Sequence, residues 1–332
     1  MMFPSSGSFD VYRMKPLRLR QMICSKLAWS IKQLLDGWPY EHFRAIEGSA
    51  DQWITRLISS HADGCDFGLH HHLLLHLLED NFDAATALIK FAAKRRLHPS
   101  GSCLHYGALQ PNEEQNIYQA IFSINDFNEG ELVLAAPEQA QADRFQSNLE
   151  EAVTVLQQAS PRTHKELEAF RPIWLLATTD PSSKRSFGGY SSSLAWSTIA
   201  LNTKTQGAMP VLVQVVHEMA HQLLFALAVD VPLAFNQPDE LFTSPLRPDP
   251  RPMDGVLHAS FVSARVHDVL RDLEDSPSWE TLSSPEKQYI QHQRNASLQA
   301  AVTSLPSIDA GARLSALGER VVAAIRQATQ AA

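Results

Sequence analysis

Residues 211–229 read Val-Leu-Val-Gln-Val-Val-His-Glu-Met-Ala-His-Gln-Leu-Leu-Phe-Ala-Leu-Ala-Val, and this stretch decides how the rest of the chain is interpreted. It is the most apolar part of the sequence, and it is long enough to span a bilayer as a helix. However, its centre holds His217, Glu218, His221 and Gln222. Four such polar side chains are costly in hydrocarbon, so the stretch predicts a buried helix of a soluble protein and no membrane partner.

The polar centre of this helix has the spacing of a metal site. His217 and His221 are four residues apart in an HExxH sequence within the predicted helix Met209–Val229. Four residues are slightly more than one helical turn, so both imidazoles project from one face and can bind one metal ion. Glu218 is rotated away from the pair and can approach a metal-bound water. The apolar flanks predict that this site is rigid and shielded from water.

A third ligand decides which class of metal site this is. The metzincin extension needs Gly and His three and six residues after His221, but Leu224 and Leu227 occupy these positions. Glu240 lies at a permissible distance, although neighbouring prolines make a helix there unfavourable. His258 has apolar neighbours and falls in the first turn of a later predicted helix. Both remain candidates from the sequence, and a purely structural role for His258 is the alternative.

The rest of the chain predicts an α+β fold that is mostly helical. Apolar runs at Ile173–Thr178 and Ser197–Leu201 predict a small sheet directly before the histidine-bearing helix. We expect an N-terminal helical region at residues 1–160 and a metal-binding catalytic region at residues 161–332, possible parts of one continuous domain. Further helices are expected at Leu17–Leu35, His70–Leu78, Asn81–Leu97, Pro137–Gln158, Thr163–Phe170, Val256–Leu273, Pro285–Ser304 and Ala310–Thr329.

Composition narrows the class of protein. The 332 residues include 44% hydrophobic and 19% charged residues, as in an ordinary globular protein. The net charge of −8 argues against a nucleic-acid partner, because no basic surface for phosphates is indicated. Three widely spaced cysteines and the lack of a signal-peptide pattern at the N-terminus lead us to expect a cytoplasmic protein. The oligomeric state is not indicated.

A second motif follows the histidine pair. Residues 244–261 read SPLRPDPRPMDGVLHASF, which has the form SPxRxDPRPxxGxxHxxF. Together with the HExxH sequence, it resembles the HExxH-type enzymes of ribosomal peptide natural-product (RiPP) pathways. The resemblance covers about residues 170–270 and leaves the N-terminal half unmatched. Ala259, directly after His258, stands where the resemblance to this family leads us to expect glycine.

This resemblance implies an activity, cofactors and a metal-binding set. It implies Fe(II)- and 2-oxoglutarate-dependent β-hydroxylation of a residue in a precursor peptide, with iron on His217, His221 and His258. The C-terminal half also resembles the zincin arrangement, in which strands lie above the metal-binding helix. We expect an edge strand near Ser197–Leu201, where an extended peptide can pair.

The implied co-substrate needs a cation for its second carboxylate, which a guanidinium supplies best. Arg251 is the first candidate and Arg247 the second, because both lie on a proline-stiffened segment before His258. The alternative is that both arginines form structural ion pairs. In the iron enzyme Glu218 orients a ligand or substrate. The competing hypothesis is a zinc peptidase in which Glu218 is the general base on a zinc-bound water.

Overall fold

The computed structural model describes residues 15–59, 61–99, 101–109, 114–123, 132–184, 186–244 and 249–330. As the sequence predicts, the fold is α+β and mostly helical, with a small mixed sheet. The helices are α1 Pro16–Asp36, α2 Tyr40–Arg44, α3 Glu47–Ile58, α4 Gly64–Leu78, α5 Phe82–Lys94, α6 Glu114–Ser123, α7 Gln139–Ala159, α8 Pro161–Phe170, α9 Ala208–Leu227, α10 Met253–Glu274, α11 Ser278–Thr281, α12 Ser284–Gly311 and α13 Ala316–Gln330. The strands are β1 Cys103–His105, β2 Leu134–Ala135, β3 Ile173–Thr179, β4 Gly189–Ser191, β5 Thr198–Asn202, β6 Leu241–Phe242 and β7 Arg251–Pro252.

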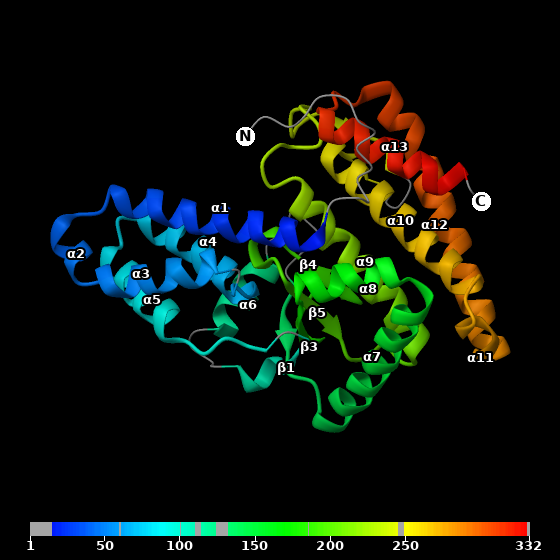
Figure 1. Ribbon diagram of the computed structural model, residues 1–332, viewed down its shortest axis with the longest axis horizontal. Helices are drawn as coiled ribbons and strands as arrows, with labels where there is room; N and C mark the ends of the chain where they lie inside the picture. The colour runs from blue at the N-terminus through cyan, green and yellow to red at the C-terminus, as the bar shows by residue number, and fades with distance from the viewer. Residues whose placement is uncertain are drawn as a thin grey trace.

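The elements form three groups in space. Figure 1 shows α1–α5 extending to one side, α10, α12 and α13 forming a helical group on the other, and the sheet with α9 between them. Helix α10 packs against α9, α12 and α13, and α9 also contacts α7 and β4. The histidine-bearing helix is therefore held on several sides by other elements, which fixes the direction of its side chains.

The main sheet has the order β1-β3-β5-β4. Strand β5 pairs in parallel with β3 and in antiparallel orientation with β4, with Tyr190 opposite Ala200. The expectation that Ser197–Leu201 forms an edge is therefore wrong. β4 is the edge strand beside β5, with β1 at the other edge, and the sequence hides β4 because three half-buried residues, Gly189–Ser191, carry no apolar run.

Elements before residue 160, the predicted boundary between the two regions, pack directly against elements after it. Strand β1 pairs in parallel with β3, and a Cβ on Gly64 would lie 1.7 Å from Thr198 Oγ1. Only glycine allows the start of α4 to approach β5 this closely. The buried guanidinium of Arg20 in α1 donates to the backbone oxygens of Ala62 and Phe170. The predicted division into two regions stays a prediction.

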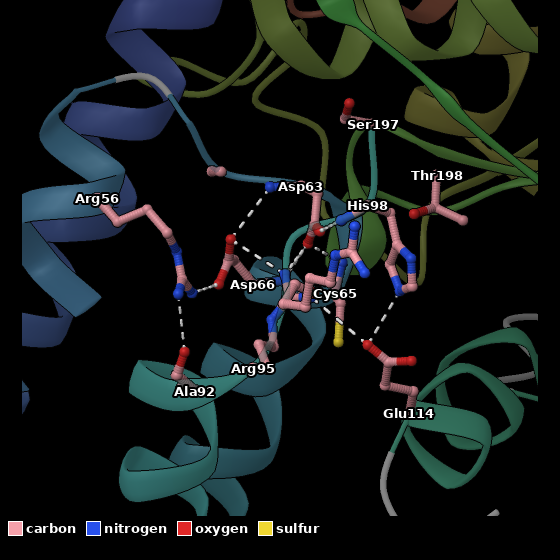
Figure 2. Close-up of polar contacts among 12 residues, drawn as sticks. Arg56, Asp63, Cys65, Asp66, Ala92, Arg95, His98, Glu114, Ser197 and Thr198 are labelled. Carbon is pink, nitrogen blue, oxygen red and sulfur yellow. Dashed lines mark hydrogen bonds and ion pairs between the residues drawn. The ribbon is translucent and has the colours of Figure 1, made fainter. Parts of the chain in front are cut away.

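A network of buried charges anchors the start of α4 (Figure 2). Asp63 and Asp66 form a capping box, in which each carboxylate accepts a backbone N–H of the other residue. Arg95 forms ion pairs with Asp63, Asp66 and Glu114, at 3.3 Å for Asp66 and 3.5 Å for Glu114. Arg56 pairs with Asp66 and donates to Ala92 O at 2.9 Å. Three helices are thereby joined around α4 by charge-assisted hydrogen bonds.

Candidate metal centre

Helix α9 carries the HExxH residues, as predicted. It begins after Gly207, whose φ of +84° suits glycine at this turn, and most of its residues are buried. The imidazole rings of His217 and His221 lie 5.0 Å apart between centroids, with an interplanar angle of 62°. The expected placement of both rings on one face of the helix is confirmed.

His258 reaches this pair from helix α10. Its ring centroid lies 6.0 Å from that of His221, at an interplanar angle of 37°. Helix α10 begins at Met253, three residues earlier than predicted, so His258 lies in the second turn. The packing of α10 against α9 therefore brings together three histidines from two segments of the chain.

The ring separations can be compared with those of known metal geometry. A metal–nitrogen distance of about 2.1 Å places each ring centroid about 3.2 Å from the ion, so two ligand rings lie about 4.5–5.2 Å apart. The His217–His221 separation of 5.0 Å agrees with this range, and the His221–His258 separation of 6.0 Å exceeds it by about 1 Å. Within the described part of the chain, no group of three or more His, Cys, Asp or Glu side chains stands arranged to hold a metal ion. A rotation or small shift of His258 is required before three nitrogens can meet at one ion.

The electrostatic surroundings keep these imidazoles uncharged. His217 is exposed, so the expectation that the site is shielded from water is wrong at this residue, but the protein atoms near its ring disfavour the charged form and lower its pKa to about 4. Burial also lowers the pKa of His221 well below its usual value, with further contributions from His217 and His258. For His258 burial lowers the pKa and the nearby Asp254 opposes the shift. Neutral imidazole is the form that binds a metal, so this donor set fits iron or zinc chemically.

Glu218 points away from the histidine pair toward strand β4. A Cβ on Gly189 would lie 2.7 Å from Glu218 Oε1, so the absence of a side chain at Gly189 leaves room for the carboxyl group. Burial raises the pKa of Glu218 to about 7, and the hydroxyl of Ser191 partly offsets the shift. Glu218 Oε2 is buried and makes no hydrogen bond in the described structure. The carboxyl group is thus poised to exchange a proton near neutral pH.

Of the two candidate arginines, Arg251 lies within the described residues and Arg247 does not. Arg251 is half-buried in strand β7, where it pairs with Phe242 of β6, and the strand ends directly before α10. Arg251 lies two positions before Met253, the first residue of α10, and His258 lies five positions after Met253, about 7.5 Å along the helix axis. The short β6–β7 pair therefore fixes the backbone of Arg251 beside the start of α10, the helix that carries His258.

Glu240 is the other sequence candidate for the third ligand. Its carboxylate accepts hydrogen bonds from Asn236 Nδ2 at 2.8 Å and from Arg313 Nη2 at 2.7 Å. These two bonds lower the pKa of Glu240, with Asn236 as the larger cause. The carboxylate holds the loop after α9 against the end of α12, and His258 is the candidate that the structure brings to the histidine pair.

Two residues close to the histidines were not named as site candidates from the sequence. Asp254 lies in the first turn of α10, with Oδ2 3.6 Å from His258 Nε2. A carboxylate that accepts a hydrogen bond from a ligating histidine fixes the orientation of its ring, and Asp254 lies within a small shift of this position. Phe225 stacks on His221 at 6.0 Å between centroids and lies 5.6 Å from His258. The spacing of residues 217, 221 and 225 is a signal in the sequence that Phe225 shares their face.

The burial of α9 bears on the type of protein. Among the described residues, α9 is the one helix long and apolar enough to cross a membrane, and 67% of its apolar window is buried inside the protein. This burial is typical of the core helix of a soluble protein.

Comparison with known proteins adds no relative to this description. No protein-family profile matches the chain, and no curated protein is significantly similar to it.

Proposed function

We propose that this chain is a cytoplasmic Fe(II)- and 2-oxoglutarate-dependent dioxygenase that β-hydroxylates a residue of a ribosomally made precursor peptide. The observation that carries this proposal is the approach of His258 to the HExxH pair, at 6.0 Å from His221, with Arg251 placed directly before the same helix. The SPxRxDPRPxxGxxH resemblance connects this arrangement to peptide modification. The sequence motif and the packing of α10 on α9 thus point to one site.

The chain's own residues have distinct roles in this proposal. His217, His221 and His258 would hold the metal through neutral imidazole nitrogens once His258 moves toward the pair, and Asp254, 3.6 Å from His258 Nε2, would orient that ring. Three protein ligands leave positions on the ion for the keto acid and for dioxygen. Iron bound with 2-oxoglutarate supplies the oxidation of a C–H bond. The guanidinium of Arg251, joined by Arg247 if that side chain also reaches the site, binds the far carboxylate of the co-substrate.

The peptide has a natural place to bind beside this site. Strand β4 is one edge of the main sheet, and its Gly189 lies against Glu218. An extended peptide can add to such an edge through main-chain hydrogen bonds. Glu218, whose pKa burial raises to about 7, then lies between the histidine pair and the peptide, where it can hold a proton or orient the substrate backbone.

The test is an anaerobic titration. Metal-free protein is loaded with Fe(II), 2-oxoglutarate is added, and the visible charge-transfer band of the chelated complex is recorded. We expect a saturable band that is lost in His258→Ala and that requires at least tenfold more 2-oxoglutarate in Arg251→Ala. Arg247→Ala, measured in parallel, shows whether the second arginine contributes. Absence of the band in the wild type, with tight retention of zinc, overturns the oxygenase proposal.

A zinc peptidase is the second candidate, and the surroundings of Glu218 favour it. The carboxyl group has an unbonded oxygen, a pKa of about 7 and a position next to an edge strand, as a general base for hydrolysis requires. In this case Glu218→Gln abolishes peptide cleavage while zinc binding is retained. In the oxygenase, the same variant keeps the charge-transfer band and a measurable rate of 2-oxoglutarate turnover.

A further inference from the structure

A cavity of about 580 Å³ adjoins the candidate metal centre. Asp254 and His258 line one side of it, and Phe225 separates it from His221. The remaining walls come from α1, from α4, from Ser193 and Trp196 before β5, and from the loop after α9. Its size lies within the range of about 300–1,000 Å³ that is usual for ligand sites. Any molecule held at His258 therefore has this space directly beside it.

The walls of the cavity are mainly apolar. Its lining includes Ile23 and Leu27 of α1 together with Phe67 and Trp196, whose rings meet edge to face at 5.6 Å between centroids. The indole N–H of Trp196 donates to Gln222 O at 3.0 Å, so its polar atom is already bonded. The cavity thus offers the aromatic and aliphatic surfaces that bind apolar side chains.

The polar groups of the cavity are mostly engaged with one another. Ser30 Oγ and His70 Nε2 are hydrogen-bonded at 2.8 Å, and burial lowers the pKa of His70 to about 4, so the pair is neutral. Lys26 forms an ion pair with Asp230 at 2.7 Å. A dicarboxylate such as 2-oxoglutarate would compete with Asp230 for this lysine. The charge balance therefore favours an uncharged, apolar occupant.

The rim of the cavity continues this apolar character. The loop after α9 contributes Pro232, Leu233 and Ala234 to the wall. Beside them Val229, Val231 and Phe235 are exposed, Phe235 to 55%. Exposed apolar side chains grouped around a cavity mark a surface that binds another molecule.

We infer that this cavity binds a short apolar segment of the peptide substrate, next to the residue that is held at the metal centre. The inference rests on the proposed function, because it assigns the occupant from the continuity of the cavity with His258. The sheet edge at β4 binds backbone and does not discriminate between side chains, whereas the cavity selects peptides with bulky apolar residues. The substrate class is therefore a peptide carrying a cluster of residues such as Leu and Phe beside the modified position.

The experiment measures peptide binding to metal-free protein by calorimetry. The probes are two acetylated, amidated heptapeptides, Gly-Ser-Leu-Phe-Leu-Ser-Gly and Gly-Ser-Ser-Asp-Ser-Ser-Gly. Ala228→Trp and Ala234→Trp place an indole in the cavity, and Ala140→Trp puts the same side chain on the exposed face of α7 as a control. We expect the apolar peptide to bind with a negative heat-capacity change, the filled variants to weaken it at least tenfold, and the control to match the wild type.

Three outcomes of the binding measurement count against the inference. Equal binding of both peptides, no binding of the apolar peptide, or unchanged affinity in a folded filled variant overturns it. Two filled variants are used so that a folding defect in one, detected by circular dichroism, leaves the other for the test. The visible spectrum of bound Co²⁺ is recorded separately and tests the histidine site. Loss of that spectrum in the wild type with retained peptide binding refutes the metal centre and leaves the cavity as a peptide site.

Discussion

The charge network around Arg95 and the candidate metal centre on α9 and α10 are both clusters of ionisable side chains, but they are built in opposite ways. The network is buried, whereas at the candidate centre His217 is exposed and His221 and His258 are half-buried. In the network, Asp63, Asp66 and Glu114 each face a guanidinium (Figure 2). At the candidate centre, the histidines are held uncharged and Glu218 keeps a buried oxygen without a hydrogen bond.

This difference separates a cluster that stabilises the fold from one for which we propose a function. Paired buried charges resist disruption because removal of one partner leaves the others unpaired in a medium of low polarity. Buried groups without partners lower stability and are retained where a bound ion or substrate completes them. Substitutions in the two clusters should therefore change stability in opposite directions.

The largest effect is expected from Arg95→Met in the charge network. The variant leaves three carboxylates around one buried position, so we expect the free energy of unfolding to fall by about 3–5 kcal/mol. Urea denaturation measures the change through the transition midpoint at constant slope. Arg96→Met, at the exposed neighbouring position, is the control and should change stability by less than about 0.5 kcal/mol. Equal effects of the two variants would show that the network does not stabilise the fold.

The opposite sign is expected from Glu218→Gln in metal-free protein. Burial raises the Glu218 pKa from 4.5 to about 7, so the folded protein binds this proton more tightly than the unfolded chain does. Wild-type stability therefore decreases as the pH rises from about 4.5 past 7, where the buried carboxyl group becomes charged. At pH 8 the variant should be more stable than the wild type by about 1–3 kcal/mol. Urea denaturation at pH 5.5 and pH 8 measures the difference, and a destabilised variant at pH 8 contradicts it.

An intermediate effect is expected from Asp254→Asn. The side chain is 66% exposed, so the stability of the metal-free protein should change little. Its carboxylate lies 3.6 Å from His258 Nε2, and its loss should weaken Co²⁺ binding about 10–100-fold. Competition with a chromogenic chelator measures this affinity. Asp275→Asn, at the exposed opposite end of α10, should bind Co²⁺ like the wild type, and identical affinities in both variants would remove Asp254 from the site.

The smallest effect is expected at the cavity wall, from His70→Gln. The folded-state pKa of His70 is about 4, below the 6.5 of an unfolded chain, so acid protonates the unfolded chain first. Wild-type stability should thus fall as the pH drops from 6.5 toward 4, and the variant should lose roughly 1 kcal/mol less between pH 7 and pH 5. Thermal unfolding at both pH values checks this against His292→Gln on the exposed face of α12. If the two variants show the same pH dependence, His70 does not have a depressed pKa.

The elements that the sequence predicts correctly are those with strong local signals. Strand β3 and strand β5 are continuous apolar runs, and α9 is a long apolar helix whose polar residues share a period. Strand β1 was missed because its three half-buried residues lie in a stretch, Pro99–Gly107, that reads as turns. Such short strands form because β3 offers them hydrogen bonds, which is a property of the neighbour and not of the segment.

The site divides in the same way. The pair His217 and His221 follows from helical spacing alone, whereas the choice between His258 and Glu240 depends on tertiary structure. The Glu240 carboxylate accepts hydrogen bonds from Asn236 and Arg313, which lie 4 and 73 residues away. The position of Asp254 required the true start of α10, which Pro252 sets three residues before the predicted one. Side-chain partners across such distances leave no periodic trace in a sequence.

The buried guanidinium of Arg20 has a consequence for synthesis on the ribosome. Its acceptors include Phe170 O and Ser197 Oγ, which lie 150 and 177 residues later in the chain. At translation rates of about 5–20 residues per second, the last of these is made roughly 10–35 s after Arg20. Helix α1 therefore emerges with a charged side chain that cannot yet be buried. We expect the nascent N-terminal helices to stay undocked, and open to chaperones, until β5 has left the exit tunnel.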